Sequence, residues 1–186
     1  MKQRSVEFVV TERRALLLAA AGLALLGAGP ARPGDPDVFS HVADRPRAPD
    51  FSLEDVDRKV WQLSGLNGRV AVVNFWATWC PPCRRELPSL ESLYRAVGSK
   101  GVIVLGVNAG EPWDTVAAFT AGLEPGLTFP ILMDEKGAMM RAWQVKALPA
   151  TYVVNRSGRI ALRALGGRDF SRPDAIEDVL RLAQEN

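Results

Sequence analysis

Cys80 and Cys83 are the only two cysteines in this chain of 186 residues. Pro81 and Pro82 separate them, and the four residues stand between an apolar run and a segment with helical periodicity. A thiol at the start of a helix lies in the positive field of the helix dipole, which favours its thiolate form. Two thiols at this spacing can close a disulfide and open it again. We therefore interpret the pair as a redox-active dithiol.

The two thiols are predicted to have different roles. Cys80 precedes the helix, so we expect it to be the exposed nucleophile, with a thiolate that backbone N–H groups stabilise. Cys83 should be more buried and protonated, and it should act as the thiol that resolves a mixed disulfide. Pro81 and Pro82 donate no N–H bond and restrict the backbone between the sulfurs, so they should tune the reduction potential. No cofactor is expected beyond this disulfide, and no metal.

Other uses of a cysteine pair fit the sequence less well. A structural disulfide that closes so short a loop gains little, because the stabilisation grows with loop length. Zinc would lack its remaining ligands, and covalent haem attachment needs a histidine where Arg84 stands. A copper-binding metallochaperone of similar fold stays open as an alternative. Its one candidate histidine would be His41, the only histidine of the chain, which otherwise has no predicted role.

Strands that alternate with helices are predicted to position the dithiol. Apolar runs and period-2 patterns predict strands at 51–53, 60–63, 70–76, 102–107, 129–133, 151–154 and 159–165. Helical patterns are expected at 80–97, 112–121, 135–143 and 171–184. The order of these elements predicts an α/β fold in which helices flank a mixed central sheet, with an N-terminal β-hairpin as an extension.

Two stretches resemble a known family. Residues 72–88 (VVNFWATWCPPCRRELP) are similar to the active-site segment of the thioredoxin superfamily, in particular its exported TlpA, ResA and CcmG (DsbE) branch. Residues 147–152 (ALPATY) resemble the segment that carries its cis-proline, Pro149. The resemblance covers residues 49–186 and implies a thioredoxin fold with thiol-disulfide oxidoreductase activity. The implied catalytic residues are Cys80, Cys83, Glu86 and Pro149. The implied substrate-binding residues are Trp79, Pro81, Pro82 and Leu148.

Polar residues around the dithiol are candidates for proton transfer. Glu86 lies three residues after Cys83, and so close to it on the helix surface, and ResA-like members also have a glutamate there. It is predicted to shift thiol pKa values or to relay a proton to the resolving sulfur, with a solvated helix glutamate as the alternative. Asn74 stands where ordinary thioredoxins have a buried aspartate, so that role would be lost or pass to Glu86. Glu111 is a further candidate for the same site. A peroxidase of the peroxiredoxin type is disfavoured, because Ala77 occupies the threonine position of its Thr-x-x-Cys motif.

The amino terminus has the composition of an export signal. Residues 15–29 carry no charge, Arg13 and Arg14 precede them, and Ala31 offers a cleavage site. Fifteen residues fall short of the ~17–25 that span a bilayer comfortably, so cleavage and retention as an inner-membrane anchor both stay open. We divide the chain into a signal peptide or membrane anchor at 1–31, a proline-rich linker at 32–48 and a thioredoxin-like domain at 49–186. The predicted location is periplasmic or extracytoplasmic.

Charge and family resemblance together indicate the partners. The net charge of +2 equals the surplus of basic residues within 1–29, so the rest of the chain is neutral, which argues against nucleic acid as a partner. The resemblance implies protein clients with cysteine pairs and a membrane thiol electron donor. It also implies that the client is an apocytochrome c or a copper-centre assembly protein. We expect a monomer that contacts the membrane only through residues 15–29.

Overall fold

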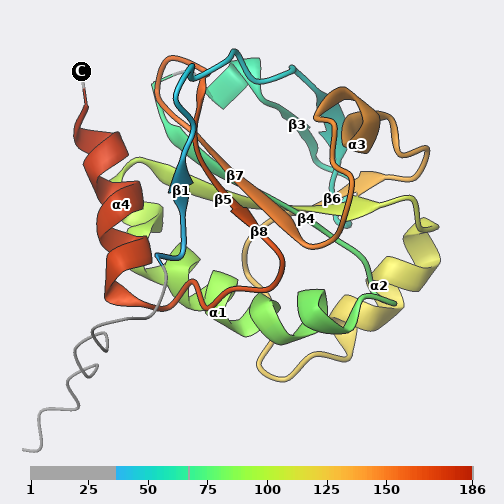
Figure 1. The fold of residues 1–186 in the computed structure, drawn as a ribbon. Coiled ribbons are helices and arrows are strands. Elements are labelled where there is room, and N and C mark those ends of the chain that lie inside the picture. Colours follow the sequence, from blue (N-terminus) through green and yellow to red (C-terminus); the bar gives the residue numbers. More distant parts are fainter. Residues whose placement is uncertain (1–36, 67, 186) are drawn as a thin grey trace, which may run out of the picture.

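The computed structural model describes residues 37–66 and 68–185 (Figure 1). The predicted signal peptide or anchor at 1–31 lies outside these residues, and so does the first part of the predicted linker. Within the described ranges, no helix is both long and apolar enough to cross a bilayer.

A six-stranded mixed sheet forms the centre of the fold, in the order β1-β8-β7-β4-β5-β6. Its strands are β1 (Ser40–His41), β4 (Val70–Trp76), β5 (Val102–Ala109), β6 (Ile131–Asp134), β7 (Ala150–Val154) and β8 (Ile160–Leu165). β4, β5 and β6 run parallel, whereas β7 is antiparallel to both β4 and β8. All seven residues of β4 are buried, as expected for a continuous apolar run with layers on both faces. The predicted mixed sheet flanked by helices is confirmed.

Two layers cover the sheet, and the side chains of β4 alternate between them. The helices are α1 (Pro81–Val97), α2 (Trp113–Ala121), α3 (Ala138–Ala142) and α4 (Pro173–Gln184). Val72 and Trp76 of β4 pack in one apolar cluster with residues of α1, α2 and α4. Val73 and Phe75 pack in the other cluster, with residues of α3 and of the hairpin. Figure 1 shows these two elements on the face of the sheet opposite α1. Because alternate residues of a strand share a face, Asn74 lies on the face that α1 covers.

The predicted hairpin is present, and part of the predicted linker packs against the domain. The hairpin consists of β2 (Ser52–Glu54) and β3 (Val60–Gln62), which form a separate two-stranded sheet. Val38 and Phe39 are only 3% and 4% exposed, and the Phe39 ring lies 5.5 Å from that of Phe170. β1 follows them and pairs with β8. Burial of these apolar side chains and pairing with the edge of β8 therefore hold this part of the predicted linker against the domain.

Asp134 explains why α3 is shorter than the pattern predicts. Its carboxylate accepts hydrogen bonds from the backbone N–H groups of Ala138, Met139 and Met140 at 2.8–3.0 Å. These are the N–H groups that the first turn of a helix leaves without a partner. Gly137 precedes them with a φ of 62°, a left-handed conformation that suits glycine. The helix therefore begins at Ala138 rather than at Glu135.

Candidate active site

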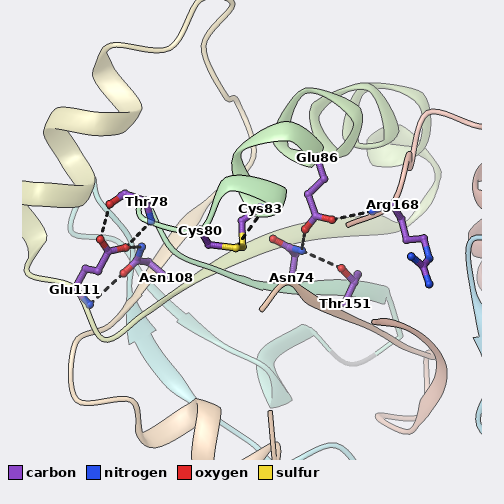
Figure 2. The surroundings of a disulfide bond; sticks show 9 residues. All are labelled: Asn74, Thr78, Cys80, Cys83, Glu86, Asn108, Glu111, Thr151 and Arg168. Carbon is purple, nitrogen blue, oxygen red and sulfur yellow. Dashed lines mark hydrogen bonds between the residues drawn. A yellow bond between two sulfur atoms is a disulfide. The ribbon is translucent and has the colours of Figure 1, made fainter. Parts of the chain in front are cut away.

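Cys80 and Cys83 form a disulfide at the amino-terminal end of α1 (Figure 2). Cys80 is the N-cap of the helix, and its Sγ accepts a hydrogen bond from the backbone N–H of Cys83 at 3.3 Å. Pro81 and Pro82 have no N–H, so that of Cys83 is the first that the helix can present to the sulfur. After reduction, a Cys80 thiolate would keep this donor and the positive end of the helix dipole.

The disulfide is almost enclosed by protein. Cys80 is 3% exposed and Cys83 is fully buried. Cys80 is thus the more exposed of the two cysteines, as predicted. It is nevertheless buried in the oxidised form, so the prediction of an exposed Cys80 is wrong for this form. The sulfurs instead pack in the apolar cluster beneath α1, together with Trp76 and Leu87.

The residues predicted to bind substrate lie on two segments beside the disulfide. Trp79 is 68% exposed and Pro81 is exposed, whereas Pro82 and Leu148 are half-buried. The Leu148–Pro149 peptide bond is cis, as the resemblance implied. Phe75 of β4 pairs with Ala150 of β7, which brings Pro149 next to the strand that leads into the dithiol.

Leu165 extends this surface and was not predicted from the sequence. It pairs with Ala150 and is 52% exposed, and the N–H of the next residue, Gly166, donates to the carbonyl oxygen of Pro149 at 2.9 Å. At Gly167, a Cβ atom would meet the Cβ of Pro82 at 3.4 Å. Only the pairing of β7 with β8 brings this segment to the dithiol, so no local pattern could have revealed it.

Glu86 is buried in α1 and bound to Asn74. The residue as a whole is only 2% exposed, and its Oε1 accepts a hydrogen bond from Asn74 Nδ2 at 2.8 Å. Oε2 accepts one from the backbone N–H of Arg168 at 3.2 Å. Asn74 Nδ2 also donates to Thr151 Oγ1 at 2.9 Å, so β4, β7 and α1 meet at this amide (Figure 2). The burial excludes the alternative of a solvated helix glutamate.

Burial raises the pKa of Glu86 to about 7. The hydrogen bonds from Asn74 and from the backbone of Arg168, and the charge of Arg168, oppose this shift only in part. The glutamate can therefore exchange a proton near neutral pH, which an ordinary carboxylate cannot do. Glu86 also lines a pocket of about 640 Å³, together with Pro82, Arg85, Gly167 and Arg168.

Glu111 approaches the site from the side opposite Glu86 (Figure 2). It is 8% exposed and accepts hydrogen bonds from the N–H and the hydroxyl of Thr78 and from Asn108 Nδ2. It thus contacts the loop that leads to Cys80 rather than Glu86. Thr78 and Asn108 had no predicted role, although Thr78 lies within the stretch that carries the family resemblance.

The one histidine lies at an edge of the sheet. His41 is in β1, where it pairs with Leu162 of β8. Across residues 37–66 and 68–185, no three His, Cys, Asp or Glu side chains come together in a way that could hold a metal ion.

Known proteins resemble this chain over most of its described part. Residues 45–163 match the AhpC/TSA family. The thiol-disulfide oxidoreductase ResA of Bacillus subtilis (strain 168) is 32% identical over 163 residues, which cover 86% of this chain and 85% of that protein. ResA of Geobacillus thermodenitrificans (strain NG80-2) is 39% identical over 119 residues, which cover 64% of this chain and 67% of that protein.

Solved structures have the same fold. A thiol:disulfide interchange protein of the thioredoxin family from Chlorobium tepidum TLS matches with a TM-score of 0.64 and 29% identity, over 75% of this chain and 99% of that one. StoA from Bacillus subtilis matches with a TM-score of 0.61 and 26% identity, over 74% of this chain and 98% of that one. The predicted thioredoxin fold is confirmed.

Proposed function

This chain belongs to the AhpC/TSA family and is a thiol-disulfide oxidoreductase, and we propose that it reduces disulfides of client proteins outside the cytoplasm. The observation that carries the proposal is the disulfide at the start of α1 with the buried carboxyl group of Glu86 on the same helix. These groups can supply a nucleophilic thiolate, a resolving thiol and a proton acceptor.

The reaction needs no cofactor other than the dithiol. The Cys80 thiolate attacks one sulfur of a client disulfide, whose S–S bond breaks as the mixed disulfide forms. The released client thiolate takes up a proton. Cys83 then gives its proton to the Glu86 carboxylate and attacks Cys80 Sγ. The second client thiolate leaves, and two electrons have passed from the dithiol to the client.

The pocket beside Glu86 gives the proton a way out. During the reaction the client covers Cys80, so exchange through the disulfide surface is blocked. The pocket instead lies between α1 and the segment after β8, where Gly167 and Arg168 line it. A proton accepted by Glu86 can therefore pass to water there before the next cycle.

The composition of the amino terminus and the similarity to the relatives support the proposed cellular setting. Residues 1–31 would export the protein, either as a cleaved signal or as an inner-membrane anchor. A membrane thiol donor would then return the disulfide to the dithiol. An apocytochrome c or a copper-centre assembly protein is the proposed client, because the chain resembles ResA and DsbE-type proteins.

Substitution of each cysteine tests the dithiol mechanism. Insulin serves as the protein disulfide, with a chemical reductant to recharge the enzyme. Cys80→Ser should abolish reduction, because no nucleophile remains. Cys83→Ser, reduced beforehand and then freed of the reductant, should attack once and stop as a mixed disulfide with insulin that mass spectrometry detects. Undiminished turnover by either variant would overturn the proposal.

The reduction potential tests the direction of electron flow. In equilibrium with glutathione, a reductant should show a value well below about −200 mV. A value near about −120 mV would assign the protein as an oxidant instead. Tight binding of Cu(I) without any reduction of insulin would favour the copper metallochaperone.

Glu86→Gln tests the proton acceptor, and Glu91→Gln is its matched control. Both glutamates are buried in α1, but Glu91 accepts hydrogen bonds from Thr128 and Arg95 instead. Although burial opposes its ionisation, these bonds hold the pKa of Glu91 below its ordinary value. Glu86→Gln should remove the dependence of thiol reactivity on pH near about 7, whereas Glu91→Gln should keep it. An unchanged profile in Glu86→Gln would leave Glu86 a structural role only.

A further inference from the structure

The side-chain amide of Asn74 is buried beside the disulfide. Asn74 is fully buried in the centre of β4, on the face that also carries Val72 and Trp76. Those two side chains pack in the same apolar cluster as Cys80 and Cys83. Such surroundings offer an amide few polar partners, so each of its hydrogen bonds has to be accounted for.

The nitrogen of this amide is satisfied and the oxygen is not. Nδ2 carries two hydrogens and donates to Glu86 Oε1 and to Thr151 Oγ1. Asn74 Oδ1 has no hydrogen-bond partner among the described residues. The two bonds from Nδ2 fix the orientation of the amide, and its oxygen points toward the disulfide (Figure 2). A buried carbonyl oxygen without a donor is uncommon and calls for an explanation.

The oxidation state of the cysteines supplies that explanation. The sulfurs of a disulfide carry no hydrogen, whereas the Cys83 thiol of the reduced protein does. Among the side chains of residues 37–66 and 68–185, the other buried nitrogen or oxygen without a partner is Trp76 Nε1. It lies toward β5, only 3.3 Å from where a Cβ on Gly106 would be. Asn74 bonds toward β7, on the opposite side of β4. The thiol that reduction creates is thus the natural donor.

We propose that Asn74 is a positioning residue for Cys83, whose thiol donates a hydrogen bond to Asn74 Oδ1 in the reduced protein. This inference rests on the proposed redox function. The bond favours the protonated resolving thiol. It also favours the dithiol over the disulfide, because only the dithiol satisfies the carbonyl oxygen.

The same amide couples Cys83 to the charge of Glu86. An ionised Glu86 accepts from Nδ2 and polarises the amide, which makes Oδ1 a stronger acceptor for the thiol. The charged groups around this amide are Glu86 of α1 and Arg168 after β8. β4, β5 and β7 contribute no charged side chain, and Tyr152 of β7 packs in the cluster on the other face.

The reduction potential of Asn74→Leu tests the proposal in the full-length protein. Leucine keeps a similar volume but removes the acceptor. The equilibrium constant with glutathione should move about tenfold towards the disulfide, which is a potential about 30 mV more negative. Thr151→Val, which leaves Oδ1 in place, should move it less than about twofold. A potential that Asn74→Leu leaves unchanged would overturn the inference.

A Glu86→Gln background separates the carbonyl oxygen from the carboxylate. If Oδ1 accepts from Cys83, Asn74→Leu should still make the potential more negative in this background. If the effect disappears there, Asn74 acts only through Glu86 and the inference fails. An unsubstituted protein that does not equilibrate with glutathione at all would instead overturn the proposed function.

A measurement on the unsubstituted protein covers the case that Asn74→Leu does not fold. With ¹³C in the asparagine side chains, the Asn74 carbonyl resonance should move when the disulfide is reduced. It should also show an isotope shift when the thiol hydrogen is exchanged for deuterium. A resonance that is the same in both oxidation states would refute the hydrogen bond.

Discussion

Glu111 binds Thr78 through both oxygen atoms of its carboxylate. Oε2 accepts a hydrogen bond from the Thr78 backbone N–H at 2.7 Å, and Oε1 accepts one from its hydroxyl at 2.5 Å. The two residues are 33 positions apart in the chain. Asn108 Nδ2 donates a third bond to Oε2 at 2.7 Å. Since Thr78 lies two residues before Cys80, this carboxylate attaches the active-site loop to the end of β5.

We expect Glu111→Gln to loosen this loop. The amide nitrogen that replaces one carboxylate oxygen cannot accept a hydrogen bond, so the backbone N–H or the hydroxyl of the half-buried Thr78 loses its acceptor. The free energy of unfolding should fall by about 2 kcal/mol, and insulin reduction should slow, because the loop carries Trp79 and Cys80. Urea denaturation and initial rates measure the two effects. Glu177→Gln, at an exposed position of α4, is the control, and equal stability of the two variants would contradict the assignment.

The buried carboxyl group of Glu86 should make stability depend on pH. Its pKa is about 7 in the folded protein, against 4.5 as the ordinary value. Between these values the folded protein keeps a proton that the unfolded chain has released. The free energy of unfolding should therefore fall as pH rises from about 4.5 to 7, by up to about 3 kcal/mol, and then level off.

Glu86→Gln isolates this contribution, because glutamine does not ionise. Denaturant unfolding of the oxidised protein should show the variant gaining stability relative to the unsubstituted protein as pH rises through this window. Other titrating groups cancel in the difference. A difference that is constant across the window would mean that Glu86 titrates normally.

Strand and helix positions followed from sequence where one local signal dominates. The strand predicted at 70–76 has the same bounds as β4, and the dithiol lies at the start of a helix as predicted. Pro88 lies inside that one continuous helix. The last helix is different, because it begins at Pro173 and not at Ser171, where the pattern predicted its start. The Ser171 hydroxyl instead bonds to Asp169.

The parts of the site that sequence could not predict depend on distant contacts. The spacing from Cys83 places Glu86 near the dithiol, but its burial depends on the backbone at Arg168, 82 residues later. Because the donor is a backbone N–H, the residue type at position 168 does not indicate that this bond forms. The bond between Glu111 and Thr78 likewise requires knowing that β5 lies beside β4. Local sequence patterns do not show that either pair of residues is in contact.

Two exposed apolar side chains, one directly before Cys80 and one on the strand that pairs with the cis-proline segment, should bind client proteins. In the described part of the chain, the large exposed apolar residues are Trp79, Leu165 and Val60, at 68%, 52% and 60% exposure. Trp79 directly precedes Cys80, and Leu165 pairs with Ala150 next to the cis-proline, whereas Val60 is in the hairpin. Trp79→Ala and Leu165→Ser should each raise KM for insulin about fivefold, as expected when a contact worth about 1 kcal/mol is lost.

Val60→Ser is the matched control, since it removes an equally exposed apolar side chain elsewhere. It should leave KM for insulin unchanged. Oxidised glutathione is too small to need the whole surface, so its rate of reduction should be similar in all three variants. If Val60→Ser raised KM as much as the other two, general loss of surface hydrophobicity would explain the effect.

Arg168 should set the pH at which Glu86 gives up its proton. Its backbone N–H donates to the carboxylate whatever the side chain, but its positive charge also lowers the pKa of Glu86. Arg168→Gln removes only the charge, so the pKa should rise above about 7. The pH midpoint of thiol reactivity should move upward with it, by a fraction of a unit. Arg163→Gln, at an exposed position of β8, should leave the midpoint in place. A midpoint that moves downward in Arg168→Gln, or moves equally in both variants, would show that the titrating group is not Glu86.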